Sequence, residues 1–221
     1  MNILIGCETS GQIRHAFRQR RHNAFSCDLL PADDDSCQHW RGDVRDAIVE
    51  PERMMAEMKC GSRFSRWDLI ILHPPCTCLC CSGNAHYGRG KPKHAERLQA
   101  IDWTMALWEL AKVHADQVCM ENPQGVLPIK PAQYIQPYQF GHNESKKTGL
   151  WLHDLEPLRP TKFVPMPLCG HRENQTPSGQ NRLGPSADRW KLRSKTYSGI
   201  AAAMAQQWGL TQAVASSAVN S

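Results

Sequence analysis

A cysteine that directly follows an apolar run is the residue of this chain best placed to do chemistry. The segment Asp68–Leu72 reads as a buried strand, and two prolines end it just before Cys76. A second apolar run, Gln117–Met120, leads into Glu121-Asn122-Pro123. Open α/β sheets place their functional groups outside the carboxyl ends of the strands. Two neighbouring strands would therefore present a thiol and a carboxyl group to one pocket, and this pairing suggests covalent catalysis.

Length and composition indicate a soluble domain of ordinary size. The 221 residues are enough to bury a core without disulfides. No stretch approaches the ~20 apolar residues that span a membrane, and the start, Met1–Gly6, reads as a strand and not as a signal peptide. The cysteines, several of which lie in apolar strands (Cys7, Cys27 and Cys119), are expected to be reduced. We therefore expect a cytoplasmic protein without membrane contact.

Basic residues are gathered in two regions of a chain whose net charge is +5. One region is the C-terminal third, and the other is a loop that follows Cys76 and contains Arg89, Lys91, Lys93 and Arg97. Clusters of this kind fit a polyanionic partner. A solvated basic surface without a partner is the alternative.

The order of the expected elements defines the fold class. Strands are expected at 2–8, 24–28, 38–43, 68–72 and 117–120, and helices are expected after Gly11, around 51–58 and over 94–114. Such alternation predicts an α/β Rossmann-like fold, with a mostly parallel sheet and helices on both faces. A further strand is expected at 149–152 and a last helix at 199–208.

Finer predictions concern individual helix faces and caps. Ser10 is the expected N-cap of the first helix, with Arg14 on its outer side. The long helix should turn Leu98, Ile101, Met105, Trp108 and Ala111 toward the sheet.

The domain organisation is expected to follow this order of elements. We expect an α/β catalytic and cofactor-binding domain over 1–155 and a small irregular substrate-recognition region over 156–193. A C-terminal helix over 194–210 should pack back on the catalytic domain, followed by a flexible tail over 211–221.

The first turn and the next two strand ends are candidates for cofactor binding. A turn over Glu8–Gly11 would place backbone N–H groups at a helix N-terminus, near a ligand. Asp28, at the end of the second strand, is placed to accept hydrogen bonds from a ribose diol, and Asp43 is placed to receive an adenine amino group. An acidic residue at a strand end is also often only a helix cap, and that alternative stays open.

With these motifs together, the chain resembles the S-adenosylmethionine-dependent DNA cytosine-C5 methyltransferases, and in particular their short, phage-type members. The Pro-Cys motif of the family is matched by Pro75-Cys76, and its Glu-Asn-Val motif is approximated by Glu121-Asn122-Pro123. The segments 139–152 and 194–204 also look like phage-type sequences. The cofactor residues that the resemblance implies are Cys7, Glu8, Thr9, Ser10, Gly11, Asp28, Leu29, Asp43 and Pro74.

The resemblance implies a specific chemistry and specific partners. Cys76 would add to C6 of a cytosine, which activates C5 toward the methyl group of S-adenosylmethionine. Glu121, protonated or sharing a proton with ring N3, would stabilise the charge that develops on the ring as the thiolate adds. Asn122 would orient the Glu121 carboxyl group or the loop. The partner would be DNA with a flipped cytosine, contacted by basic residues in the loop 82–93 and beyond: Arg89, Lys91, Lys93, Lys146 and Lys147. If the protein is phage-encoded, it would work in the bacterial host cytoplasm.

Three departures from the family pattern limit which properties of the family we expect in this chain. The cofactor turn has one glycine where the family has several, and Lys146-Lys147 stand where the family has a Gln-x-Arg-x-Arg element. Little chain separates the strand at 149–152 from the last helix, whereas family members with strict recognition carry a large domain there. We therefore expect short or relaxed sequence specificity, or a homo-oligomer.

Three other interpretations stay open. Cys78, Cys81, Cys169 and His171 have spacings that allow a zinc site, although a metal there would compete for the nucleophile, and we expect none. A related methyltransferase that acts on RNA or on nucleotides would have a similar pocket. A silent DNA-binding protein is the third, but DNA binding alone requires neither Cys76 nor Glu121.

Overall fold

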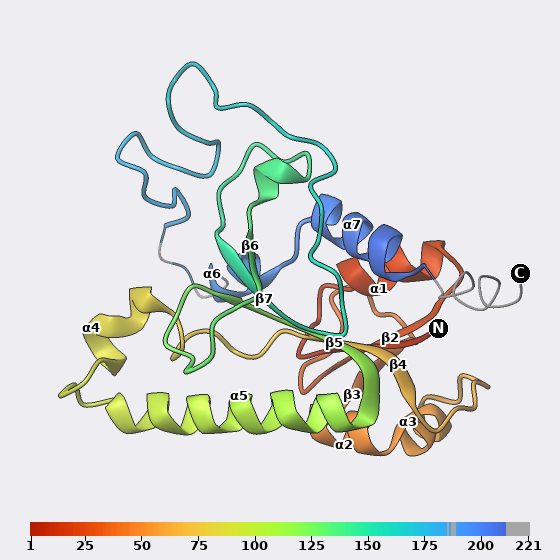
Figure 1. The fold of residues 1–221 in the computed structure, drawn as a ribbon. Coiled ribbons are helices and arrows are strands. Elements are labelled where there is room, and N and C mark those ends of the chain that lie inside the picture. The colour runs from red at the N-terminus through yellow and green to blue at the C-terminus, as the bar shows by residue number, and fades with distance from the viewer. Residues whose placement is uncertain (185, 187–188, 211–221) are drawn as a thin grey trace, which may run out of the picture.

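Five parallel strands form the centre of the sheet in the computed structural model, which describes residues 1–184, 186 and 189–210. The strands are β1 (Asn2–Gly6), β2 (Asn23–Asp28), β3 (His39–Arg41), β4 (Trp67–Leu72) and β5 (Ala115–Pro123). The strand β7 (Thr148–His153) pairs antiparallel with β5, and the short β6 (Gln133–Ile135) pairs antiparallel with β7. The sheet order is β3-β2-β1-β4-β5-β7-β6. The predicted Rossmann-like α/β fold is confirmed (Figure 1).

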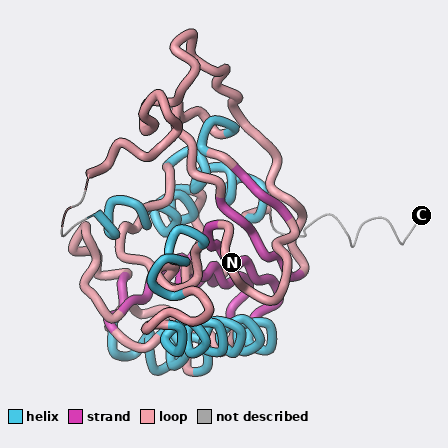
Figure 2. Tube along the Cα trace, turned by 90° about the vertical axis from the view of Figure 1, so that its left-hand side faces the viewer, coloured by secondary structure: helices cyan, strands magenta, loops and turns pink. Residues whose placement is uncertain are grey.

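Helices cover both faces of this sheet. One face is covered by α1 (Gln12–Gln19) and α7 (Ser198–Trp208), and the other by α2 (Val44–Val49), α3 (Pro51–Met58) and α5 (His94–His114) (Figures 1 and 2). Successive strand residues point to opposite faces, so Leu4 packs in one core cluster while Ile3 and Ile5 pack in the other. A sheet that is buried on both faces requires the nearly continuous apolar runs seen in the sequence.

The chain direction across the sheet reverses between β1 and β4. From β1 the chain moves outward through β2 and β3, and it then returns to β4 and moves outward on the other side. Ligands of open α/β sheets bind in the crevice outside the carboxyl ends of the strands at such a reversal. The turn after β1 and the segment after β4 both lie at this point.

Several local predictions are corrected by the structure. Arg14 is fully buried and does not lie on the outer side of α1, and Leu98 is half exposed and does not face the sheet. The buried side of α5 instead includes Arg97, Thr104 and Leu107. The helix α1 begins at Gln12 with Gly11 as its N-cap, whereas Ser10 was expected. Gly11 has φ 70°, a left-handed conformation that glycine adopts at little cost.

An irregular lobe follows β7. Between residues 154 and 188, the described residues include no helix or strand, and the short helix α6 (Arg189–Ser194) then leads toward α7. The lobe, at the top of Figure 1, is held together by buried Arg172, which donates to the carbonyl groups of Val164 and Pro165 and lies 4.3 Å from the ring centre of Tyr138. Asn143 accepts a further bond from Arg172. The tail 211–221, predicted to be flexible, lies outside the described residues.

All ten cysteines are free thiols, and Cys37, Cys81 and Cys169 are exposed. In the described part of the chain, no helix is both long enough and apolar enough to cross a membrane.

Substituting Gly199 by alanine is expected to destabilise the fold. Gly199 lies in the first turn of α7, and a Cβ atom there would lie 1.9 Å from the carbonyl oxygen of Phe140. Because that oxygen belongs to the backbone, α7 would have to shift, at a cost of about 1–3 kcal/mol in the free energy of unfolding. Urea titration measures this cost. Gly184→Ala is the control, because among the described residues, its chain neighbours aside, no atom lies within 4 Å of its added Cβ. Equal effects of the two substitutions would contradict the explanation.

Candidate active site

The segment that carries Cys76 is fixed to the end of β5. The parallel pairing of β4 with β5 ends at Leu72 and Met120, so Cys76 and Glu121 both lie past it at the carboxyl edge. The buried side chain of Asn122 donates from Nδ2 to the carbonyl oxygen of Pro74 over 2.9 Å. The structure therefore brings Pro74-Pro75-Cys76 next to Glu121-Asn122. The strand β5 also runs on to Pro123, whereas its predicted end was Met120.

The local backbone turns sharply at Cys76. The Cys76 carbonyl accepts hydrogen bonds from the N–H groups of Leu79, at 3.0 Å, and Cys80, at 2.9 Å. Burial raises the pKa of the Cys76 thiol, and the neighbouring Cys80 and Glu121 raise it further, while the positive charges of Lys146 and Arg193 act in the opposite direction. These effects together favour the neutral thiol form of Cys76.

Glu121 is surrounded by groups that stabilise its negative charge. Burial acts to raise the pKa of its carboxyl group, but Lys146, His73 and Thr148 together lower it below the usual value. His73 Nδ1 lies 3.2 Å from Glu121 Oε2. These groups favour the ionised form of the Glu121 carboxyl group. A proton shared with ring N3 of a bound base stays a prediction. Lys146 was predicted to contact DNA, but it lies beside this carboxylate and lines a small cavity with it.

Replacing Lys146 with methionine is expected to raise the pKa of Glu121. The substitution removes the strongest effect that opposes burial, so the carboxyl group would titrate at higher pH. The titration of the ¹³C-labelled side-chain carboxyl group, followed by NMR, measures this change without any need for activity. Lys147→Met is the matched control, because Lys147 Nζ lies over the ring of Tyr134 at 4.3 Å. A Glu121 titration unchanged in Lys146→Met would contradict this account of the site.

The site contains unusual unsatisfied polar atoms. In the described residues, three side chains have a buried nitrogen or oxygen atom without a hydrogen-bond partner, and two of them, His73 Nε2 and Asn122 Oδ1, belong to this site. Buried polar groups are nearly always paired, so each exception requires an explanation such as a ligand or water. Their location favours a polar ligand at the carboxyl edge of β4 and β5.

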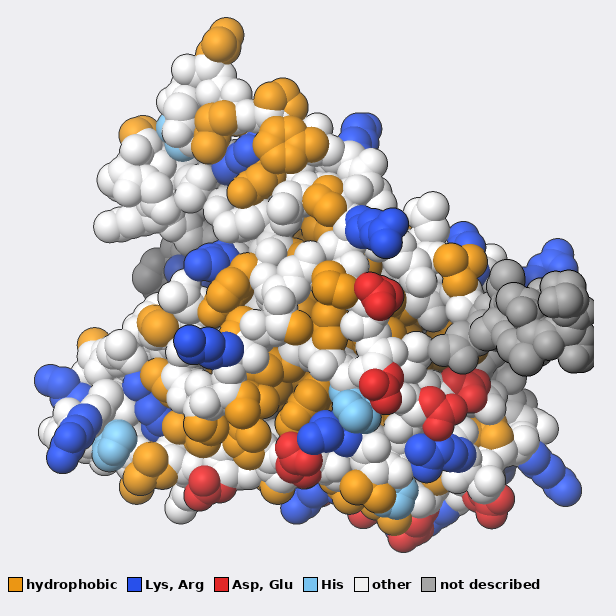
Figure 3. Space-filling view, viewed as in Figure 1, with side chains coloured by type: hydrophobic (Ala, Val, Ile, Leu, Met, Phe, Trp, Pro, Cys, Tyr) orange, Lys and Arg blue, Asp and Glu red, His pale blue; other side chains and the backbone are white. Residues whose placement is uncertain are grey.

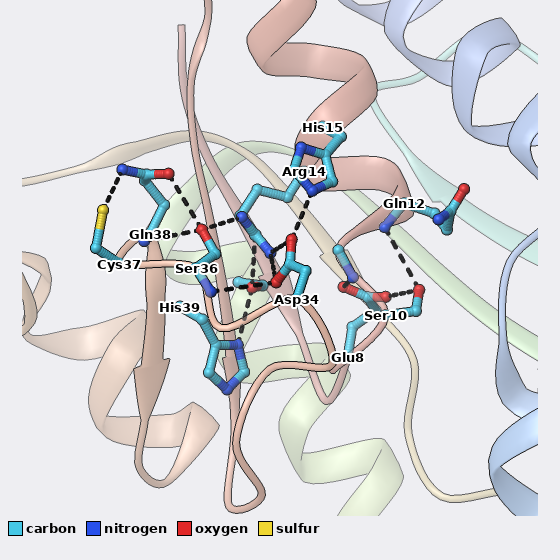
Figure 4. Close-up of polar contacts among 12 residues, drawn as sticks. Glu8, Ser10, Gln12, Arg14, His15, Asp34, Ser36, Cys37, Gln38 and His39 are labelled. Atoms are coloured by element: carbon cyan, nitrogen blue, oxygen red, sulfur yellow. Dashed lines mark hydrogen bonds and ion pairs between the residues drawn. The ribbon is translucent and has the colours of Figure 1, made fainter.

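The turn after β1 forms a second part of the site. The Glu8 carboxylate accepts hydrogen bonds from the Ser10 hydroxyl group and, over 3.1 Å, from the Gly11 N–H group (Figure 4). Ser10 in turn accepts from the Gln12 N–H group over 3.4 Å. Of the N–H groups that we expected to face a ligand, that of Gly11 is therefore bonded within the turn, and that of Glu8 donates to the Cys27 carbonyl oxygen. A carboxylate at this helix N-terminus disfavours the pyrophosphate of a dinucleotide and favours a cationic group.

The two acidic strand ends differ in their contacts. Asp28 accepts a hydrogen bond from the Leu30 N–H group over 2.9 Å, and the neighbouring Leu29 exposes 69% of its surface. Asp43 caps α2 by accepting from the Arg45 N–H group and also pairs with the Arg45 side chain. Asp43 therefore caps a helix, which is the alternative that the sequence had left open. Asp28 and Leu29 combine a polar and an apolar group, which suits a nucleoside.

Two cavities share Thr196 and Tyr197 as lining residues, and one of them is lined by Gln12 and the other by Glu121. The larger, of about 310 Å³, is lined by Gln12, Glu144, Leu192, Lys195, Thr196, Tyr197 and Ser198. The smaller, of about 10 Å³, is lined by Glu121, Ile135, Lys146, Thr148, Thr196, Tyr197, Ile200 and Met204. Tyr197, which lines both, donates from its hydroxyl group to Glu144 over 2.6 Å. The segments 139–152 and 194–204 were recognised in the sequence, but these roles of His73, Glu144 and Tyr197 were missed because the residues meet only through the fold.

The other predicted nucleic-acid contacts lie on the surface. Arg89 and Lys91 are exposed, and Lys93 lies 3.7 Å from Glu96. Within the predicted loop, the structure forms the short helix α4 (Asn84–Tyr87). Figure 3 shows Lys and Arg side chains around this end of the molecule and in the region between it and the irregular lobe. In the described part of the chain, no three His, Cys, Asp or Glu residues are grouped to hold a metal ion.

Comparison with known proteins finds weak structural likeness. Neither the scan against protein-family models nor the search of curated proteins finds a match. Among solved structures, the chain is similar to the crystal structure of the S. pombe Dnmt2 methyltransferase, with 12% sequence identity and a TM-score of 0.39. The similarity covers 68% of this chain and 48% of that chain, so this chain spans about half of its length. A similarity this weak assigns no function, so a functional proposal must rest on the geometry of the site.

Proposed function

We propose that the protein is a DNA cytosine-C5 methyltransferase, a short member of that family, which uses S-adenosylmethionine and a covalent bond between Cys76 and C6 of the base. The observation that carries the proposal is the hydrogen bond of 2.9 Å between Asn122 and Pro74. It holds the segment of the thiol against the end of the strand that carries the carboxylate. This is the pair of groups that the reaction requires, at the edge of the sheet where ligands bind.

The residues of the chain account for the proton and electron balance. The carbon C5 of cytosine becomes nucleophilic only after sulfur adds to C6, since the ring then reacts as an enamine. The Cys76 thiol must give up a proton in this step, and ring N3 must gain one. Glu121 is ionised, so it is able to take the first proton and deliver the second. After C5 has gained the methyl group, the C5 proton is lost to water, the C5–C6 double bond is restored and the thiolate is expelled. Ring N3 returns its proton through Glu121 to the thiolate, so the net product besides the methylated base is one proton released to solvent.

The turn after β1 fits the proposed cofactor. S-adenosylmethionine supplies an electrophilic methyl group on a sulfonium, and it also carries an ammonium group and an adenosine. The Glu8 carboxylate suits the positive charge, while Asp28 and exposed Leu29 suit the ribose and the adenine. Gln12, the residue that follows the turn, lines the larger cavity, which shares Thr196 and Tyr197 with the cavity at Glu121. Cys7, Thr9, Ser10, Gly11, Asp43 and Pro74 shape these surfaces in the proposal.

We propose that the protein binds DNA mainly through phosphates and reads little of its sequence. Arg89, Lys91, Lys93 and Lys147 would contact phosphates, and the cytosine would be flipped out of the duplex. The cavity at Glu121, of about 10 Å³, must open to admit a base. With only the irregular lobe between β7 and α6, the recognised sequence would be short or relaxed, or a second copy of the chain would contribute.

Methyl transfer from tritiated S-adenosylmethionine to DNA, RNA and dCMP tests the proposal. We expect incorporation into DNA above that into the other two. Incorporation into RNA or dCMP alone would replace DNA as the substrate, and binding of DNA without any transfer would indicate a silent binding protein. Bisulfite sequencing of DNA from an expressing host measures specificity, and one long recognition site would contradict the prediction of a relaxed one.

A further inference from the structure

His73 lies between the two halves of the site. It is the first residue after β4, and its N–H group donates to the Gly6 carbonyl oxygen of β1 over 2.9 Å. Its side chain is 8% exposed, and Nδ1 lies 3.2 Å from Glu121 Oε2 of β5. One residue thus contacts both neighbouring strands at the carboxyl edge, three positions before Cys76.

The contact with Glu121 determines which imidazole nitrogen carries a proton. A carboxylate accepts hydrogen bonds and does not donate them, so Nδ1 must carry the hydrogen. In the neutral imidazole, Nε2 then has a free lone pair and is an acceptor. That nitrogen is buried, and no described residue donates to it. Leaving such an atom unpaired is costly, which favours a ligand atom as its partner.

The side chain lies on the same side of the sheet as the cavity at Glu121. Leu69 and Ile71 of β4 and Cys119 of β5 pack in the core cluster that includes α7. Alternation along the strands places His73 and Glu121 on that side too. The other titratable or charged groups that act on Glu121 or line its cavity are Cys76, Cys119, Lys146 and Tyr197. His73 contacts Glu121 but does not line the cavity, so the cavity must open before a ligand reaches both residues.

We propose that His73 determines base specificity: Glu121 holds its Nδ1–H group, and its Nε2 accepts a hydrogen bond from an exocyclic amine of the ligand. The inference rests on the proposed function, and within it the ligand is a pyrimidine that reaches Glu121 with its Watson–Crick edge. Cytosine carries an amine at C4, which donates to the lone pair. Uracil and thymine carry an oxygen there, whose lone pairs would face that of Nε2. The site therefore takes cytosine and rejects uracil and thymine.

Trapping with fluorinated bases tests the specificity. Single-stranded oligonucleotides with one 5-fluorocytosine or one 5-fluorouracil are incubated with S-adenosylmethionine and the protein, and the rates of adduct formation are compared. His73→Ala removes the acceptor, so the preference for fluorocytosine is expected to fall by about tenfold or more. His73→Gln offers an amide N–H to Glu121 and a carbonyl oxygen to the base, so it should retain most of the preference. An unchanged preference in His73→Ala would overturn the inference.

A second measurement separates this inference from the proposed function. The ¹⁵N chemical shifts of His73 in the unliganded protein report which ring nitrogen is protonated, and this requires no activity. We expect hydrogen on Nδ1, which faces Glu121, and none on Nε2. A protonated Nε2 would overturn the inference even if the protein methylates cytosine. If the tautomer is as expected but the wild-type protein forms no adduct with either base, the covalent mechanism is wrong, and the specificity inferred from it is overturned as well.

Discussion

Replacing Cys76 with serine is expected to lower the rate of methyl transfer at least about a thousandfold. The hydroxyl group of serine is a far weaker nucleophile than a thiolate and does not ionise near neutral pH. Without addition at C6, C5 of cytosine does not react. The rate is measured with tritiated S-adenosylmethionine and DNA, under conditions in which the wild-type protein turns over.

Cys81→Ser is the matched control for this loss. Cys81 is an exposed thiol five positions later, and its substitution should leave the rate within about twofold, as surface changes remote from the chemistry do. Circular dichroism should show the same fold for both variants. Methyl transfer by Cys76→Ser at a rate close to that of the wild-type protein would remove Cys76 from the mechanism.

Replacing Asp34 with asparagine is expected to lower the free energy of unfolding by about 2–3 kcal/mol. Arg14 has a fully buried side chain that donates to both oxygens of Asp34 at 2.8 Å and also contacts Ser26 and Ser36 (Figure 4). Without the carboxylate, a buried guanidinium group is left without its counter-charge. Asp34 exposes 27% of its side chain, so we expect less than the full cost of breaking a buried ion pair. Denaturant titration measures the difference.

The contribution of the ion pair between Arg14 and Asp34 to the free energy of unfolding should also depend on pH. Burial acts to raise the pKa of Asp34, but Arg14 and His15 lower it below its usual value. The stabilisation is therefore complete above the pKa of the unfolded chain, about 3.9, and is lost as the pH falls through the lower pKa of the folded state. Asp116→Asn is the control, because Asp116 and Arg66 form an exposed pair, worth less than about 1 kcal/mol. Equal losses in the two variants would contradict the account of the buried pair.

The elements with strong periodicity could be predicted from the sequence. The helix α5 covers 94–114 as expected, and the central strands lie in the expected runs. Shorter elements, such as α2 and β6, were missed because six and three residues contain less than two helical turns and too few alternations to show a period. The inward direction of Arg14 was also missed, because a charged residue is buried only when its partners are present, and Asp34 lies 20 positions away.

The candidate site could be predicted in part. Cys76, Glu121 and Asn122 follow apolar runs, and the topology of parallel sheets brings such positions together. Lys146 lies in a loop before β7, and neither its place beside Glu121 nor that of His73 follows from periodicity. Asp43 was expected either to bind an adenine amino group or to cap a helix, and in the structure it caps α2. The sequence alone could not distinguish ligand binding by Asp43 from helix capping, because the capping contact depends on the position of Arg45.

The most direct test of the central claim is the identification of the residue that bonds to the base. DNA containing 5-fluorocytosine is incubated with S-adenosylmethionine and the wild-type protein, because fluorine at C5 blocks the elimination that would release the thiolate. Proteolysis and mass spectrometry of the adduct then locate the modified peptide. We expect one nucleotide on Cys76 and no adduct with Cys76→Ser. Methylation of unmodified cytosine without any such adduct, or an adduct on another cysteine, would contradict the account.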